Sequence, residues 1–202
     1  MEVDEFKDNP FTVVIDQDDH IHVVRATQSY DLSHHAHAFL RSADILPNII
    51  EAEEYDKKSE YLFPMLFCYR HSCELILKEL LFYTERAIDE SKIASDQKFG
   101  LEKMMDFIFA RSGHRIGALL DKLLERSTFL GLDPIPQEVI YAVKRLGDED
   151  PNGEVFRYPF SRQVELHYEN AMMFDVRNIK NVLGHRLHWL LEARLQQIKN
   201  LR

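Results

Sequence analysis

The sequence predicts an all-α fold, in which a helical bundle at residues 26–202 follows a short β-hairpin appendage in residues 1–25. Three observations lead to this prediction. Several long segments carry apolar residues at helical spacing. Leu, Glu, Lys, Arg and Ala, which favour helices, are abundant. The seven glycines and seven prolines fall mostly between the long segments. A chain of 202 residues is long enough for one such domain with a substantial core.

The hairpin is predicted for residues 11–25, FTVVIDQDDHIHVVR. Its two halves are rich in β-branched residues and alternate in part, and Asp16–Asp19 supplies the turn. Because an isolated hairpin is only marginally stable, we expect it to pack on the helical body or to pair with another edge. His20 and His22 are interpreted as surface residues of this hairpin.

From Ala26 onward the pattern becomes helical, and Pro47 predicts a kink or a division into two consecutive helices. His34 and His37 lie on one face of this helix, which is an arrangement that can begin a metal site. However, no HExxH or ExxH pattern accompanies them. We therefore interpret these histidines as exposed or close to the helix cap, and predict neither a metal site nor a cofactor.

The central segment of the chain is Tyr61–Tyr83, which is apolar almost all round and is therefore predicted to be a helix buried inside the bundle. Arg70, Glu74 and Lys78 follow one another at intervals of four residues, and His71 is adjacent. Two interpretations of this polar stripe remain open. It forms an intrahelical ladder of ion pairs that fixes the packing, or it belongs to a partly buried polar cluster that lines a cleft.

Three shorter helices are predicted after the central one. The polar segment 84–100 ends the central helix, and LEKMMDFIFAR follows it as an amphipathic helix. His114 opens the next helix, HRIGALLDKLLERSTFL, and QEVIYAVKRLG forms the third. A long amphipathic helix from about Val164 to Leu201 completes the bundle, and Gly184 inside it permits the close approach of another backbone or a ligand.

The loop GDEDPNGEVFRYPFS separates the last two helices and combines an acidic entrance with an aromatic and basic exit. Large apolar side chains on a loop usually dock somewhere, so Phe156, Arg157 and Tyr158 indicate more than a linker.

Composition restricts the class of partner. The formal net charge of −9 argues against non-specific nucleic-acid binding by the whole surface, although it leaves room for a local basic groove. The two cysteines lie five residues apart in one predicted helix and cannot bridge, which is consistent with a reducing, cytoplasmic location. The acidic N-terminus is not that of a signal peptide, and the longest apolar run is too short to cross a membrane.

Three motifs in order carry a resemblance to a known family: LFPMLFCYRHSCELILKELL, GHRIGALLDKL and GEVFRYPFS. The succession of YRHxxELxLK, GHxxxxLL and FRYP resembles a group of uncharacterised bacterial helical proteins related to the HEPN superfamily. The resemblance covers roughly residues 60–190 as ordered motifs rather than as aligned identity. It implies a HEPN-like bundle that forms a homodimer or binds a partner protein. It also implies a role in toxin–antitoxin, phage-defence or RNA-processing systems.

Nuclease members of that superfamily carry an arginine and a histidine at a short spacing along the dimer seam. In that pattern four to six residues separate the arginine from the histidine. The nearest match here is Arg177–Asn178 followed by His185, and seven residues lie between Arg177 and His185, one more than the pattern allows. In such a site the histidine serves as acid or base while the RNA 2′-hydroxyl attacks the phosphate, and the arginine stabilises the developing charge. The alternative is that these polar groups lie on the exposed face of a terminal helix.

The family motifs also indicate a second candidate site, away from Arg177 and His185. Arg70, His71, Glu74 and Lys78 on the central helix are expected to converge with His114 and with the Arg157–Tyr158 loop. Such a network either holds the loop to the bundle or, if open to solvent, forms an anion site for phosphate or a nucleotide. The expected partners include RNA or another phosphate-containing ligand. The sequence thus favours a non-catalytic binding or oligomerisation module, and the alternative is a metal-independent endoribonuclease. Whether the chain is an enzyme stays open at this stage.

Overall fold

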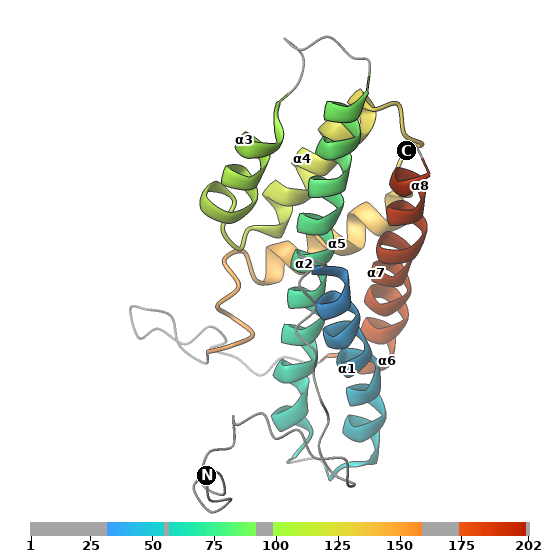
Figure 1. Cartoon of the computed structure of the whole chain (residues 1–202). Helices are drawn as coiled ribbons and strands as arrows, with labels where there is room; N and C mark the ends of the chain where they lie inside the picture. Colours follow the sequence, from blue (N-terminus) through green and yellow to red (C-terminus); the bar gives the residue numbers. More distant parts are fainter. Residues whose placement is uncertain (1–31, 55–56, 92–98, 159–173, 201–202) are drawn as a thin grey trace, which may run out of the picture. The chain divides into compact units, whose positions relative to one another are not determined.

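The structure is a computed structural model that describes residues 32–54, 57–91, 99–158 and 174–200. These residues are mostly helical and include no β-strand, which confirms the all-α prediction for this part of the chain (Figure 1). The predicted hairpin, with His20 and His22, lies outside the described residues. Within the described part, no helix combines the length and the apolar character that crossing a membrane requires.

Helix α2 (Lys58–Glu90) is the central element, and it contacts α1, α3, α4, α5, α7 and α8. Figure 1 shows it running along the length of the helical body with the other helices around it. Its buried side chains include Ile76, Leu77, Lys78 and Glu79, which are consecutive and therefore point to different sides of the helix. A helix buried on all sides fits the nearly continuous apolar sequence from which its burial was predicted.

Helix α2 is longer than predicted, because it continues beyond Tyr83 through the segment that was expected to end it. The Glu85 carboxylate is fully buried and binds Arg126 of α4, with 2.9 Å between Oε2 and Nε. The Thr84 hydroxyl donates to the Leu80 carbonyl one turn earlier. The polar residues in this segment are therefore satisfied inside the fold and do not end the helix.

Helix α1 (Leu32–Ala52) packs along α2. It buries Ala36, Leu40, Ala43 and Ile50, a spacing that places them on one face of the helix. Of the two alternatives predicted at Pro47, a kink or a division into two helices, the division is wrong, since α1 continues through this residue as a single helix. Pro47 is itself buried, so its ring contributes to the apolar face.

Three helices on another side of α2 lead to the candidate site. Helix α3 (Leu101–Asp106) continues as a π-helical turn (Phe107–Arg111), and α4 (Ile116–Phe129) follows. Helix α5 (Gln137–Glu149) packs against both α4 and α2. The three predicted helices are thus present, although α4 begins two residues after His114. His114 therefore lies in the turn before α4, at the surface.

The C-terminal helical segment alternates between α and π geometry. It consists of α6 (Val176–Ile179), α7 (His185–Trp189) and α8 (Leu195–Lys199), joined by the π-helical turns Lys180–Gly184 and Leu190–Arg194. The start that was predicted near Val164 lies outside the described residues. The predicted helix is not continuous through Asp175, because Asp175 has an extended backbone and caps α6 by accepting from the Asn178 N–H at 2.9 Å.

Candidate anion-binding site

Arg70 joins three segments of the chain at one guanidinium group. It comes from the middle of α2 and is only 2% exposed. Its Nη1 lies 2.8 Å from Glu74 Oε2, its Nε donates to the Asp150 carbonyl at 3.2 Å, and its Nη2 donates to the His114 carbonyl. Arg70 therefore fixes the turn before α4 and the loop after α5 to the central helix.

Glu74 is the anionic centre of this network. Its Oε1 accepts from Lys78 Nζ at 2.8 Å, and both of its oxygens lie 3.0–3.1 Å from His114 Nδ1, in addition to the contact of Oε2 with Arg70. Burial alone would raise the pKa of the Glu74 carboxyl, but the hydrogen bonds and charges of Lys78 and His114 outweigh it and lower this pKa below its ordinary value. An ionised carboxylate only accepts hydrogen bonds, which assigns the proton of this contact to His114 Nδ1.

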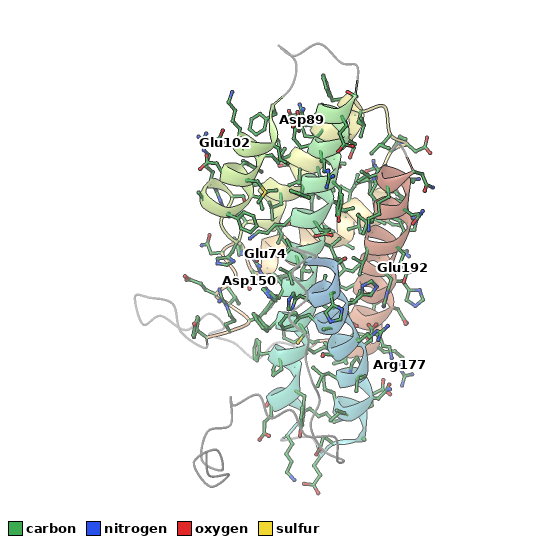
Figure 2. The ribbon with its side chains drawn as sticks, viewed as in Figure 1. Glu74, Asp89, Glu102, Asp150, Arg177 and Glu192 are labelled. Atoms are coloured by element: carbon green, nitrogen blue, oxygen red, sulfur yellow. The ribbon has the colours of Figure 1, made fainter. Side chains whose placement is uncertain are left out.

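The stripe on α2 is therefore a buried ladder of ion pairs, as one of the two sequence interpretations has it. Arg70 and Lys78 each pair with Glu74 one turn away at 2.8 Å. The contacts to His114 and Asp150 extend the ladder to other segments, as the second interpretation expected. Figure 2 shows Glu74 and Asp150 near each other, where α2 passes the end of α5.

Asp150 organises the loop after α5. It is fully buried, and its Oδ1 accepts from the backbone N–H groups of Glu154 at 2.7 Å and Val155 at 3.1 Å. Its Oδ2 lies 3.2 Å from Arg70 Nε, which is an ion-pair distance without the alignment of a hydrogen bond. One carboxylate thus closes the turn of the loop and neutralises the buried guanidinium.

Gly153 allows this loop to pass over Arg70. Its φ of 74° lies in the left-handed region, and a Cβ built on it would stand 3.1 Å from Arg70 Cζ. The Gly153 carbonyl accepts from Arg157 Nε, which holds the second arginine of the site. The loop conformation and the position of Arg157 both depend on this residue.

An open pocket of about 690 Å³ lies beside the network. Its lining comes from two segments, one before α4 and one after α5: Arg111, Ser112, Gly113, His114, Arg115, Asn152, Glu154, Arg157 and Tyr158. Three guanidinium groups and one carboxylate give this pocket a positive charge on a chain whose formal net charge is −9. A concave surface with a net positive charge concentrates the field, so the pocket attracts anions locally.

The protein itself holds the three arginines in place. Arg111 Nε pairs with Asp106 at 2.6 Å, and Arg115 Nη2 donates to the Arg111 carbonyl at 2.7 Å. The Arg157 guanidinium lies 5.9 Å from the Phe67 ring and 5.7 Å from the Tyr158 ring, which are cation–π distances. A guanidinium carries five N–H donors, so each arginine retains donors for a ligand.

The structure separates His71 from the polar network. Its ring stacks on Phe67 at 5.6 Å and meets the edge of Phe39 at 4.5 Å, inside an aromatic cluster between α1 and α2. Burial lowers the pKa of the His71 imidazole, which favours the neutral form. The predicted residues Arg70, Glu74, Lys78, His114, Arg157 and Tyr158 do gather at the pocket or directly behind it.

Arg177, Asn178 and His185 lie elsewhere, on exposed positions of α6 and α7. Figure 2 places Arg177 on the other side of α1 from Glu74 and Asp150. Arg177 Nε pairs with Glu51 Oε1 of α1 at 2.9 Å, and this hydrogen bond lowers the pKa of the Glu51 carboxyl. The structure thus holds two separate groups of sequence-predicted site residues.

The sequence patterns did not identify some residues of the site. Asp150 lies in an acidic run that is typical of exposed loops. Arg111 lies outside the three motifs, and Arg115 occupies an unspecified position of GHxxxxLL. A second polar cluster was also missed: Asp44 accepts from the Tyr69 hydroxyl at 2.8 Å and lies 3.0 Å from His188 Nε2. This cluster joins α1, α2 and α7, elements that are far apart in sequence.

Among the described residues, which include His34 and His37, no group of three or more His, Cys, Asp or Glu side chains is placed to hold a metal ion. His37 Nδ1 instead lies 3.1 Å from the Ser33 carbonyl of its own helix. Comparison with family models, curated proteins and solved structures finds no match to this chain.

Proposed function

We propose that this chain is a HEPN-like, non-catalytic binding module that holds a phosphate-containing ligand in the pocket between Arg111–Arg115 and Asn152–Tyr158. The observation that carries the proposal is the gathering of three arginines around an open pocket on an acidic protein. Planar guanidinium groups suit phosphate because they donate two parallel hydrogen bonds to its oxygens. The ordered motifs that resemble the superfamily meet at this pocket, which supports treating them as one unit.

The buried network supports binding because it holds both walls of the pocket before any ligand arrives. Arg70 bonds to the His114 carbonyl on one wall and to Asp150 at the start of the other. A binding site whose walls are already fixed loses less conformational entropy when it takes up a ligand. The network is thus a positioning device for the pocket and does not itself contact the ligand.

The same network favours binding over catalysis at this pocket. A general base needs a lone pair that faces the substrate. Glu74, which is only 2% exposed, directs its oxygens to Arg70, Lys78 and His114. Its pKa is also lowered, so that it is a weak proton acceptor at neutral pH. The site offers positive charge and hydrogen-bond donors, which are the requirements of anion recognition.

The test is calorimetric titration of the purified protein with inorganic phosphate and pyrophosphate at low and high salt. We expect saturable binding that weakens with salt, since exposed charges are screened. Arg115→Ala is expected to weaken binding by about tenfold, the effect of losing one charge-assisted hydrogen bond. Arg177→Ala, the matched control at an exposed arginine outside the pocket, is expected to leave binding unchanged.

Two results would overturn the proposal. One is the absence of binding by protein that is folded according to circular dichroism. The other is an equal loss of affinity in Arg177→Ala and Arg115→Ala, which would mean that only the general charge of the surface matters.

A second candidate function is a metal-independent endoribonuclease that uses Arg177, Asn178 and His185. The observation in its favour is the π-helical turn Lys180–Gly184 between them. In a regular α-helix, residues eight positions apart differ in direction by about 80°. A π-helical turn takes up one extra residue. Arg177 and His185 therefore differ in direction as if they were seven positions apart in a regular α-helix, which is a difference of about 20°. Both residues are exposed, which agrees with a shared face.

The ribonuclease candidate predicts cleavage of single-stranded RNA in the presence of a metal chelator. Arg177→Ala and His185→Ala are each expected to abolish it, whereas Arg115→Ala is not. Sedimentation of the protein would show whether a dimer brings two such faces together, as the family resemblance implies. If folded protein leaves a varied set of RNAs intact, this candidate is wrong.

A further inference from the structure

His114 turns one ring nitrogen to the buried network and the other to the pocket. Its Nδ1 lies 3.0 Å and 3.1 Å from the two carboxylate oxygens of Glu74, and its carbonyl accepts from Arg70. Helix α2 therefore fixes both the ring and the backbone of His114. Among the described residues, Nε2 has no hydrogen-bond partner, and the side chain, which lines the pocket, is 54% exposed. Nε2 is thus the ring nitrogen that a ligand can reach.

We propose that His114 contacts the bound anion through Nε2 and does so as an imidazolium, so that the pocket takes up a proton together with its ligand. This inference rests on the proposed function, and it identifies a further ligand-binding residue that makes the affinity of the same site depend on pH. An ionised carboxylate only accepts hydrogen bonds, so Glu74 keeps a proton on Nδ1. A second proton can then enter the ring only at Nε2.

The charge state of the ring reverses what Nε2 offers to an anion. In the neutral ring with its proton on Nδ1, Nε2 carries a lone pair, which repels the oxygens of phosphate. In the imidazolium, Nε2–H donates a charge-assisted hydrogen bond to the same oxygens. A ligand that prefers the protonated ring binds more tightly as the pH falls, and by reciprocity its binding draws a proton onto the ring.

The surroundings of the ring also favour proton uptake on binding. The charged and titratable groups at the pocket or in the network behind it are Arg70, Glu74 and Lys78 on α2, Arg111 and Arg115 beside His114, and Asp150, Glu154, Arg157 and Tyr158 on the loop after α5. Three of these arginines line the pocket with His114, and their charge opposes a further positive charge on the ring. A bound anion neutralises that charge and places the imidazolium between two negative groups, the ligand and Glu74.

The experiment is calorimetric titration of the full chain with inorganic sulfate at about pH 5.5 and about pH 8, a range over which an imidazole ordinarily changes its charge. Sulfate has the shape of phosphate and remains a dianion at both pH values, whereas a phosphate group itself titrates in this range. We expect sulfate to bind about tenfold more tightly at the lower pH, the effect of gaining one charge-assisted hydrogen bond. Near neutral pH, titrations in buffers of different ionisation enthalpy are expected to show proton uptake on binding.

Two substitutions at His114 separate its ring nitrogens. His114→Asn removes Nε2, while the amide nitrogen of Asn takes the place of Nδ1 as the donor to Glu74. His114→Gln instead places a neutral amide donor at the position of Nε2, and it serves as the test if His114→Asn does not fold. Each variant is expected to bind sulfate with the same affinity at both pH values and without proton uptake. His35→Asn on α1, the matched control at an exposed histidine outside the pocket, is expected to retain the pH dependence.

The outcomes separate this inference from the proposed function. Equal sulfate affinities at the two pH values in the parent chain overturn the inference, while the proposed function stands if phosphate binds. A pH dependence that persists in either folded His114 variant overturns it as well, because another group would then take up the proton. Sulfate that fails to bind where phosphate binds also overturns it, since an imidazolium donates to either anion. If neither anion binds at either pH, the proposed function fails together with the inference.

Discussion

Gly153 lies directly over the buried guanidinium of Arg70, so that a Cβ at Gly153 would stand 3.1 Å from Arg70 Cζ. The loop after α5 and the central helix therefore meet at a point where only a hydrogen atom fits. The pocket wall that begins at Asn152 follows from this contact, because the Gly153 carbonyl also holds Arg157.

This contact predicts that Gly153→Ala is more harmful than its backbone angle alone explains. Gly131 is the matched control, because its φ of 73° is nearly the same as the 74° of Gly153, while nothing lies within 4 Å of its Cβ position. Gly131→Ala is expected to cost about 1–2 kcal/mol from left-handed backbone strain. Gly153→Ala is expected to cost a further 1–3 kcal/mol, roughly, from overpacking. Urea unfolding measures both, and equal losses would contradict the close contact.

Glu74→Gln is expected to destabilise the fold strongly, because Arg70 and Lys78 lose the carboxylate that neutralises them in the interior. Removing one partner of a buried ion pair typically costs about 3–5 kcal/mol. The matched control is Glu90→Gln on the same helix, whose pair with Arg86 has side chains that are 47–48% exposed. It should change stability by less than about 1 kcal/mol. Similar losses for the two variants would argue against a buried network.

The same carboxylate predicts a specific acid sensitivity. Because the pKa of Glu74 is lower in the folded chain than its ordinary value of 4.5, its ionised form stabilises the fold above pH 4.5. This contribution is lost as the pH falls through the lowered pKa. The difference in unfolding free energy between the parent and Glu74→Gln should therefore be largest near neutral pH and shrink as the pH falls below 4.5 and through the lowered pKa. A difference that stays constant over this range would contradict the assignment.

A prediction outside the pocket concerns the Asp44 cluster. A Cβ at Gly184 would stand 2.8 Å from Asp44 Oδ1 and 3.4 Å from the Tyr69 hydroxyl. Gly184→Ala should therefore displace Asp44 and cost about 1–3 kcal/mol. Gly117→Ala in α4 is the control, since nothing lies within 4 Å of its Cβ position. It should be neutral or stabilising by up to about 1 kcal/mol, because alanine favours helix. Thermal unfolding compares the two variants.

The sequence predicted the helices well where apolar residues recur at helical spacing, as in α2, α4 and α5. It failed where a long-range partner decides the outcome. Glu85 reads as the exposed end of a helix, but Arg126, which is 41 residues away, pairs with it inside the fold. Local patterns contain no information about such a partner, so the end of α2 was placed too early.

The candidate site was predictable to a similar degree. The Arg70, Glu74 and Lys78 stripe was visible because polar residues stood out in an apolar helix, and His114 and Arg157 followed from their motifs. Asp150 was not identified, because its burial depends on the position of Arg70, 80 residues earlier. The partners of His71 were also misjudged, since a histidine beside a polar stripe points to a different side of the helix.

The contacts of Arg70 also determine when the pocket is assembled as the chain folds. Glu74 is available as soon as α2 forms, but His114 and Asp150 are 44 and 80 residues away. Contacts between distant segments close long loops, and the entropy lost in this closure delays them relative to local contacts. The pocket walls should thus join late, after α1 has packed on α2, and detach first during partial unfolding. Hydrogen exchange at Glu154 and Val155, whose amides bond to Asp150, would then be faster than exchange in the core of α2.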